Sequence, residues 1–254
     1  MAMTFTPREN FESAELNVSP LRLTTNGKNV RFFAEKLSVP RIDMHVHRPR
    51  LDRLLRKSLE QTGAVLVTGR AATGKTALAA NFARGYDRTI WYRVEAADSD
   101  WKVFSSYLFA GINNDSPAIS EGGIAGFVEM LAREAESGDK PALLVLDDIH
   151  NVFDTGWFHE FFLTLLTSLS PDTHLICLTR SLPSVPLWRL RSKQVLSVLD
   201  EKVITLDEAE TAEFCMNWGI PVDEAARLQA ESFGRVGKLK ALCEFRQEDM
   251  LEKS

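Results

Sequence analysis

The stretch from Gly69 to Thr76 reads Gly-Arg-Ala-Ala-Thr-Gly-Lys-Thr and matches the pattern G-x-x-x-x-G-K-[ST]. It lies between an apolar run at 64–68 and a segment with helical character. The two glycines let the backbone wrap closely around a ligand, so that its N–H groups point at phosphate oxygens. Lys75 supplies a point charge for the β- and γ-phosphates, and the Thr76 hydroxyl can bind Mg²⁺. The stretch therefore predicts a phosphate-binding loop between a strand and a helix.

Strand-like and helix-like segments alternate along the chain around this loop. Short apolar runs predict five strands, at 64–68, 89–94, 143–146, 174–178 and 203–206. Apolar residues at helical spacing predict helices from Pro49 onward and at 76–84, 101–112, 124–136 and 157–169. This alternation predicts an α/β fold, a P-loop NTPase whose mainly parallel five-stranded sheet is covered by helices.

The sequence divides into three parts. Residues 1–40 form an N-terminal extension, in which Asn26-Gly27 between alternating segments predicts a hairpin. Residues 41–206 hold the alternating strands and helices of the ATPase domain. Residues 207–254 are helical to the end, and we expect them to form a small lid.

Composition excludes several classes of protein. With 254 residues, 44% hydrophobic and 26% charged, the chain is neither disordered nor a coiled-coil rod. It has no apolar run long enough to cross a membrane and no secretory signal. The three cysteines, Cys177, Cys215 and Cys243, lack metal-ligand spacing and suit a reducing cytoplasm. The net charge of −5 argues against polyanion binding by the whole chain, although a local basic patch stays open.

Two adjacent acids follow the third predicted strand. A parallel strand presents its C-terminal residues at the ligand edge of the sheet. Asp147 is therefore the expected Mg²⁺ carboxylate, and Asp148 the candidate to orient or deprotonate the attacking water. Because the acids are neighbours, the two roles could be exchanged.

Arginines provide the remaining candidates. Arg180, after the fourth predicted strand, can touch the γ-phosphate and report its loss. Residues 46–51, Val-His-Arg-Pro-Arg-Leu, either line the adenine and ribose or are an ordinary basic helix start. Arg189 and Arg191 fit a phosphate or partner contact, and fit a solvated helix face equally well.

Taken together, these motifs resemble a known family. Around the loop, residues 46–51, Asp147-Asp148-Ile149-His150, Thr179-Arg180, the stretch 181–191 and the stretch 204–210 recur in order. The chain resembles, over roughly residues 41–245, the nucleotide-binding module of signal-transducing ATPases with numerous domains (STAND), closest to the MalT-like regulators of the LuxR type.

The resemblance implies that ATP or ADP and Mg²⁺ bind between the sheet domain and the lid. It also implies that nucleotide state and an inducer control self-association. The residues expected at the nucleotide are Val46, Arg48, Gly69, Ala72, Thr73, Gly74, Lys75, Thr76 and Asp147, with Thr76 and Asp147 on the metal. The catalytic candidates are Lys75, Asp148 and Arg180, with Arg180 sensing the nucleotide state.

The sequence departs from the family at the lid. Where the family carries a Gly-x-Pro motif, the stretch from Gly234 to Leu239 has no proline. Relatives continue into a winged helix, superhelical repeats and a DNA-binding domain, for which a chain ending at Ser254 has no room. We therefore expect a stand-alone subunit or a fragment, and the DNA-binding activity of the family is not carried over.

Three functions are consistent with these observations. The first is a slow, Mg²⁺-dependent ATPase that acts as a cytoplasmic signalling switch controlling partner binding or self-association. The second is a nucleotide-gated interaction protein that does not hydrolyse. The third is a DNA-associated ATPase of the AAA+ type, supported only by the basic segment 41–57.

Overall fold

The central feature of the fold is a five-stranded parallel sheet. The computed structural model describes residues 21–25, 28–32, 34–42, 48–112, 122–136 and 141–252. The sheet contains β3 (Ala64–Thr68), β4 (Arg88–Arg93), β5 (Ala142–Asp147), β6 (Thr173–Thr179) and β7 (Ser197–Leu199). Its strand order is β4-β5-β6-β3-β7, and every neighbouring pair is parallel. The predicted fold class is therefore confirmed.

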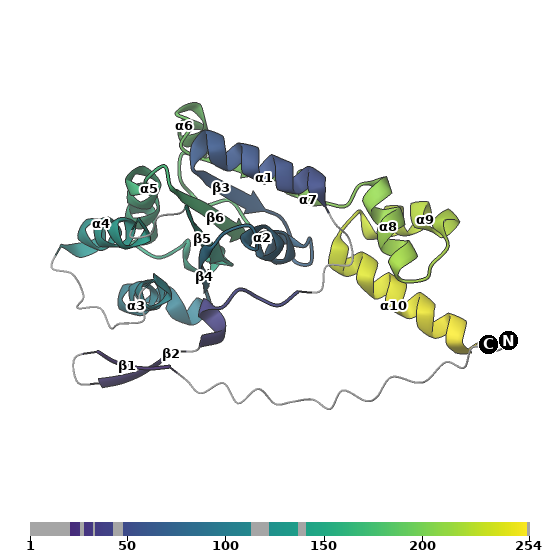
Figure 1. The fold of residues 1–254 in the computed structure, drawn as a ribbon, viewed down its shortest axis with the longest axis horizontal. Coiled ribbons are helices and arrows are strands. Elements are labelled where there is room, and N and C mark those ends of the chain that lie inside the picture. The colour runs from purple at the N-terminus through teal and green to yellow at the C-terminus, as the bar shows by residue number, and fades with distance from the viewer. Residues whose placement is uncertain are drawn as a thin grey trace.

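Helices cover both faces of this sheet (Figure 1). The helices α1 (Pro49–Thr62) and α2 (Lys75–Ala83) lie on one face, and α3 (Trp101–Ile112), α4 (Gly123–Ala135) and α5 (Phe158–Ser168) lie on the other. Side chains of a strand point alternately to the two faces. Accordingly, Val65 and Val67 pack with α1 and α2, whereas Leu66 packs with α3, α4 and α5.

The fifth strand differs from the prediction, which was wrong about residues 203–206. The strand is β7, and residues Glu201–Ile204 form the short helix α7. The Asp200 carboxylate accepts a hydrogen bond from the Val203 N–H at 3.2 Å and starts this helix as its N-cap. Ile204 from this apolar run is buried all the same, because it packs into the α1–α2 side of the core.

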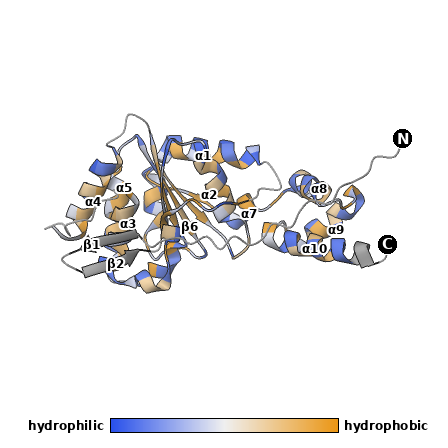
Figure 2. Cartoon of the chain, turned by 60° about the horizontal axis from the view of Figure 1, so that its bottom comes forward, coloured by the Kyte–Doolittle hydropathy of each residue, from blue (hydrophilic) through white to orange (hydrophobic). Residues whose placement is uncertain are grey.

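The C-terminal helices form a separate cluster. The helices α8 (Glu208–Asn217), α9 (Val222–Ser232) and α10 (Val236–Glu252) enclose their own small core, centred on Phe214, Leu228 and Leu239. Figure 2 shows these helices to one side of the sheet, each carrying both hydrophobic and hydrophilic residues. We call this cluster the lid.

The remaining elements are short. Where the sequence analysis expects a hairpin, β1 (Leu21–Thr25) pairs antiparallel with β2 (Lys28–Phe32). The short helices are η1 (Ala34–Leu37), η2 (Ala96–Ser99), η3 (Ile149–Val152) and α6 (Leu187–Ser192). Among the described residues, no helix combines the length and apolarity needed to cross a lipid bilayer.

Candidate functional site

The phosphate loop connects β3 to α2, as its sequence predicts. Gly74 precedes α2 with a φ of 89°, a conformation that glycine adopts without steric cost. Lys75 Nζ donates hydrogen bonds to the carbonyl oxygens of Gly69 at 2.5 Å and Arg70 at 2.9 Å. The ammonium is buried in the loop, and burial lowers the pKa of Lys75 below its usual range. The loop, the ammonium and the positive end of the α2 dipole therefore meet at one point.

Asp147 and Thr76 meet beside this loop. Asp147 ends β5, is only 2% exposed, and accepts a hydrogen bond from the Thr76 hydroxyl, whose oxygen lies 3.2 Å from Oδ2. Burial, and next to it the charge of Asp148, raise the pKa of the Asp147 carboxyl to about 6. A cation would relieve this crowding of negative charge, and hydroxyl and carboxylate oxygens are ligands that Mg²⁺ prefers. The two residues therefore fit a magnesium ion.

Arg180 reaches the same edge because β6 lies between β3 and β5. Its Nε is 3.6 Å from Oδ1 of Asp148, and Nδ1 of His150 is 3.7 Å from the same oxygen. Asp148 has a φ of 54°, so the chain turns sharply after β5. Burial lowers the pKa of His150 below its usual range. Three different motifs of the sequence predicted Lys75, Asp148 and Arg180 as catalytic candidates. The structure brings these three residues to the same end of the sheet.

The lid touches the phosphate loop directly. The Gly237 N–H at the start of α10 donates a hydrogen bond to the Ala72 carbonyl at 2.9 Å. A side chain on Gly237 would bring its Cβ to 2.6 Å from Cβ of Ala72, so only glycine permits this approach. The stretch from Gly234 to Leu239 lacks the proline of the family. At this stretch the backbone of the lid packs closely against the backbone of the phosphate loop.

We expect Gly237→Ala to release the lid from the loop, because the added methyl cannot fit against Ala72. Amide hydrogen exchange in residues 69–74 and 236–240 should then become several-fold faster. Gly156→Ala is the matched control, since nothing lies within 4 Å of a Cβ at Gly156. Equal exchange in both variants and the unchanged protein would show that this contact does not hold the lid.

Helix α7 joins the loop to the lid. Its first residue, Glu201, accepts hydrogen bonds from the Arg70 backbone N–H at 2.8 Å and from Nη2 of the same residue at 2.7 Å. These bonds to Arg70 lower the pKa of Glu201 below its usual range. The sequence analysis missed this pair. The one signal that could have found it is the capping aspartate at 200, which places a helix here instead of a strand.

Arg48 lies at the hinge between sheet and lid. Its Nη2 donates to the carbonyls of Ile204 and Thr205, both at 2.9 Å, and to Oε2 of Glu210 at 3.0 Å. The guanidinium is therefore occupied by the end of α7 and the start of α8. Val46, expected near the base, lies outside the described residues. The assignment of both residues to the nucleotide stays a prediction.

In this parallel sheet, β3 leads into the phosphate loop, and Asp147 at the end of β5 lies beside that loop. This arrangement defines a P-loop NTPase. The chain belongs to the AAA domain family, whose model matches residues 56–190, more than half of the chain. Members of such families typically bind a nucleotide and Mg²⁺.

Curated relatives include the HTH-type transcriptional regulator MalT of Yersinia pestis (strain Pestoides F) and that of Yersinia pseudotuberculosis (strain YPIII). Each is 28% identical over an alignment of 176 residues, which covers 64% of this chain and 19% of the relative. The chain thus spans about a fifth of the length of these relatives.

A solved structure shows a similar fold. The ORC1 protein of Aeropyrum pernix, in complex with DNA, superposes with a TM-score of 0.52 at 16% identity, over 81% of this chain and 60% of that one. RuvB of Thermotoga maritima gives a TM-score of 0.46 at 19% identity, over 82% and 63% of the two chains. At such identities the ORC1 likeness concerns the fold alone.

Proposed function

We propose that this chain binds Mg·ATP, hydrolyses it slowly, and acts as a signalling switch of the STAND class. The observation that carries the proposal is the hydrogen bond from Gly237 to Ala72, because the lid rests on the loop that would hold the phosphates. A movement of that loop on nucleotide binding or hydrolysis would then be transmitted to the lid. Slow turnover suits a switch, since the product-bound state must persist.

Each candidate residue at the carboxyl ends of the strands has a role in this proposal. Lys75 and the loop backbone would hold the phosphates, and Thr76 and Asp147 would hold Mg²⁺, which neutralises phosphate charge when bound. Asp148 would orient the attacking water, and Arg180 would contact the γ-phosphate. The lid position would then control self-association or the binding of a protein partner, as the resemblance to MalT-like regulators suggests. We place the switch in the cytoplasm, because Cys177, Cys215 and Cys243 are free thiols.

The test is Asp148→Asn, which keeps the shape of the side chain and removes its charge. We expect single-turnover hydrolysis of bound ATP to fall about 100-fold or more, the usual contribution of a general base. ATP affinity should stay within about threefold, because Asp147 and Thr76 still hold the metal. Unchanged hydrolysis in this variant would remove Asp148 from the mechanism.

A second function is a nucleotide-gated interaction protein that does not hydrolyse. It is favoured by the approach of Arg180 to Asp148, since that ion pair occupies the carboxylate that hydrolysis needs. Mass spectrometry of nucleotide released from the purified protein separates the two functions. Bound ADP after expression supports the hydrolysing switch, whereas bound ATP that persists with Mg²⁺ supports the second function.

A third function, a DNA-associated ATPase of the AAA+ type, was suggested by the basic segment 41–57. The described cations of this segment fall into two groups, those in ion pairs and those that are exposed. Arg50 forms ion pairs with Glu210 at 3.0 Å and Asp207 at 3.3 Å, and Arg48 also pairs with Glu210. Arg53 and Lys57, by contrast, remain exposed. In the described part of this segment, 41–42 and 48–57, the exposed cations remain available to a partner.

A further inference from the structure

A basic and aromatic surface lies on α6 and the turn after it. Residues 181–199 contain three cations, Arg189, Arg191 and Lys193, and no acidic residue, in a chain whose net charge is −5. All three cations are exposed, and none of them forms an ion pair with a described carboxylate. Trp188 is 69% exposed, with the guanidinium of Arg189 5.4 Å from its ring centre. Trp188 therefore offers a large aromatic surface to a ligand beside the three cations.

Helix α1 extends this surface. Arg53, Lys57 and Gln61 follow one another at intervals of four, so they share one face of the helix, and all three are exposed. Gln61 lines the same pocket as Arg191, which places the end of this face beside α6. The acid Glu60 lies away from this pocket, in a different pocket that His174 also lines.

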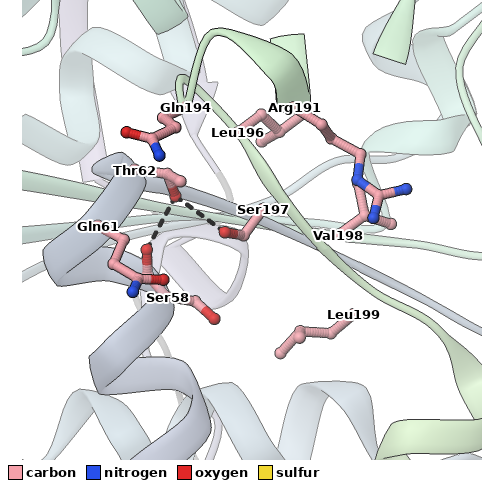
Figure 3. Close-up of a pocket in the computed structure, with 9 residues that line it drawn as sticks. All are labelled: Ser58, Gln61, Thr62, Arg191, Gln194, Leu196, Ser197, Val198 and Leu199. Carbon is pink, nitrogen blue, oxygen red and sulfur yellow. Dashed lines mark hydrogen bonds between the residues drawn. The ribbon is translucent and has the colours of Figure 1, made fainter. Parts of the chain in front are cut away.

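The pocket shared by the two helices is polar (Figure 3). Its volume is about 590 Å³, and its polar lining consists of Ser58, Gln61, Thr62, Arg191, Gln194 and Ser197. The Thr62 hydroxyl bonds to the Ser58 carbonyl at 2.8 Å and to the Ser197 hydroxyl at 3.2 Å. No carboxylate lines this pocket. Donors and one cation with no opposing acid suit an anionic ligand.

The surface is separate from the nucleotide site. The pocket lies where α1 ends before β3 and where β7 begins, at the amino ends of the strands. Asp147 and Thr179, by contrast, are at the carboxyl ends of β5 and β6. A ligand on this surface would therefore leave the phosphate loop free.

We propose that this surface, made of Arg53, Lys57, Trp188, Arg189, Arg191 and Lys193 around the pocket, binds single-stranded nucleic acid. The cations repeat over two elements, as contacts to successive phosphates require. The exposed indole offers a face on which an unpaired base stacks, and the paired bases of a duplex are not free to stack there. The hydroxyls and amides of the pocket can bond to phosphate or base-edge atoms.

Fluorescence anisotropy of the full chain with a labelled 20-nucleotide oligothymidine tests the proposal. We expect binding at 50 mM NaCl that weakens with salt, with a logarithmic slope of about −2 to −3.5 for three to five phosphate contacts. The triple variant Arg189→Glu/Arg191→Glu/Lys193→Glu should lose at least about tenfold in affinity. Trp188→Ala should lose about fivefold or more, with the salt slope nearly unchanged, because stacking releases no counterions.

The matched control reverses three cations elsewhere, Lys102→Glu/Arg133→Glu/Lys240→Glu, on α3, α4 and α10. Absence of binding at 50 mM NaCl, or an equal loss in both triple variants, would overturn the proposal. So would heparin binding with the same sensitivity to Trp188→Ala, because heparin has no bases. A change in oligomeric state of the α6 triple variant without nucleic acid would assign the surface to a second copy instead. ATP binding measured in parallel keeps this result distinct from the test of the nucleotide switch.

Discussion

Replacement of Lys75 by alanine is expected to abolish ATP binding. The ammonium lies inside the loop, against the carbonyls of Gly69 and Arg70, where a phosphate would meet it. A hydrogen bond to a charged group is worth about 1.5–3 kcal/mol, so contacts to two phosphates together account for a loss of about 100-fold or more. Titration calorimetry with Mg·ATP measures this loss directly.

The control for this variant is Lys102→Ala, which removes an exposed lysine from α3. A saturating ligand at about 100 times its Kd stabilises the folded state by about 2.7 kcal/mol, so Mg·ATP should raise the Tm of the control. The Lys75 variant should keep a folded circular dichroism spectrum and show no such rise. Native affinity in that variant would mean that the nucleotide binds elsewhere.

The strands of the sheet could be predicted because each central strand is a short, apolar run. Parallel strands covered on both faces have no polar side, and all six residues of β5 are buried. The site followed from the same logic. Carboxyl ends of parallel strands share one edge, so Asp147 and Arg180 had to lie near the loop.

The parts that could not be predicted depend on contacts between distant residues. β7 has only three residues, and its partner in the sheet is β3. Arg48 and Glu210 are 162 positions apart, and nothing in the basic segment 41–57 indicates which of its arginines find an acid. The contact of Gly237 with Ala72 likewise depends on how the lid packs against the phosphate loop.

The second large effect is expected for Arg48→Ala, at the hinge. Arg48 is 4% exposed and bonds two carbonyls and the buried carboxylate of Glu210. Its removal leaves these acceptors buried with fewer donors, and breaking a buried ion pair costs about 3–5 kcal/mol. Hydrogen exchange should show the lid, residues 208–252, opening more often than the sheet. Arg53→Ala is the control, because Arg53 is exposed on α1, the helix that Arg48 precedes.

The effect of Arg48→Ala on the stability of the lid should depend on pH. Burial alone would raise the pKa of Glu210, but hydrogen bonds from Arg48 and Arg50 outweigh it and hold the pKa below the ordinary 4.5. A lowered pKa in the folded state contributes stability above about pH 4.5, which is lost as the pH falls through the folded pKa. Without Arg48, the pKa of Glu210 should rise, and lid protection should fall at a higher pH than in the unchanged protein. If ATP affinity drops while lid exchange at every pH stays unchanged, Arg48 acts on the nucleotide and not on the hinge.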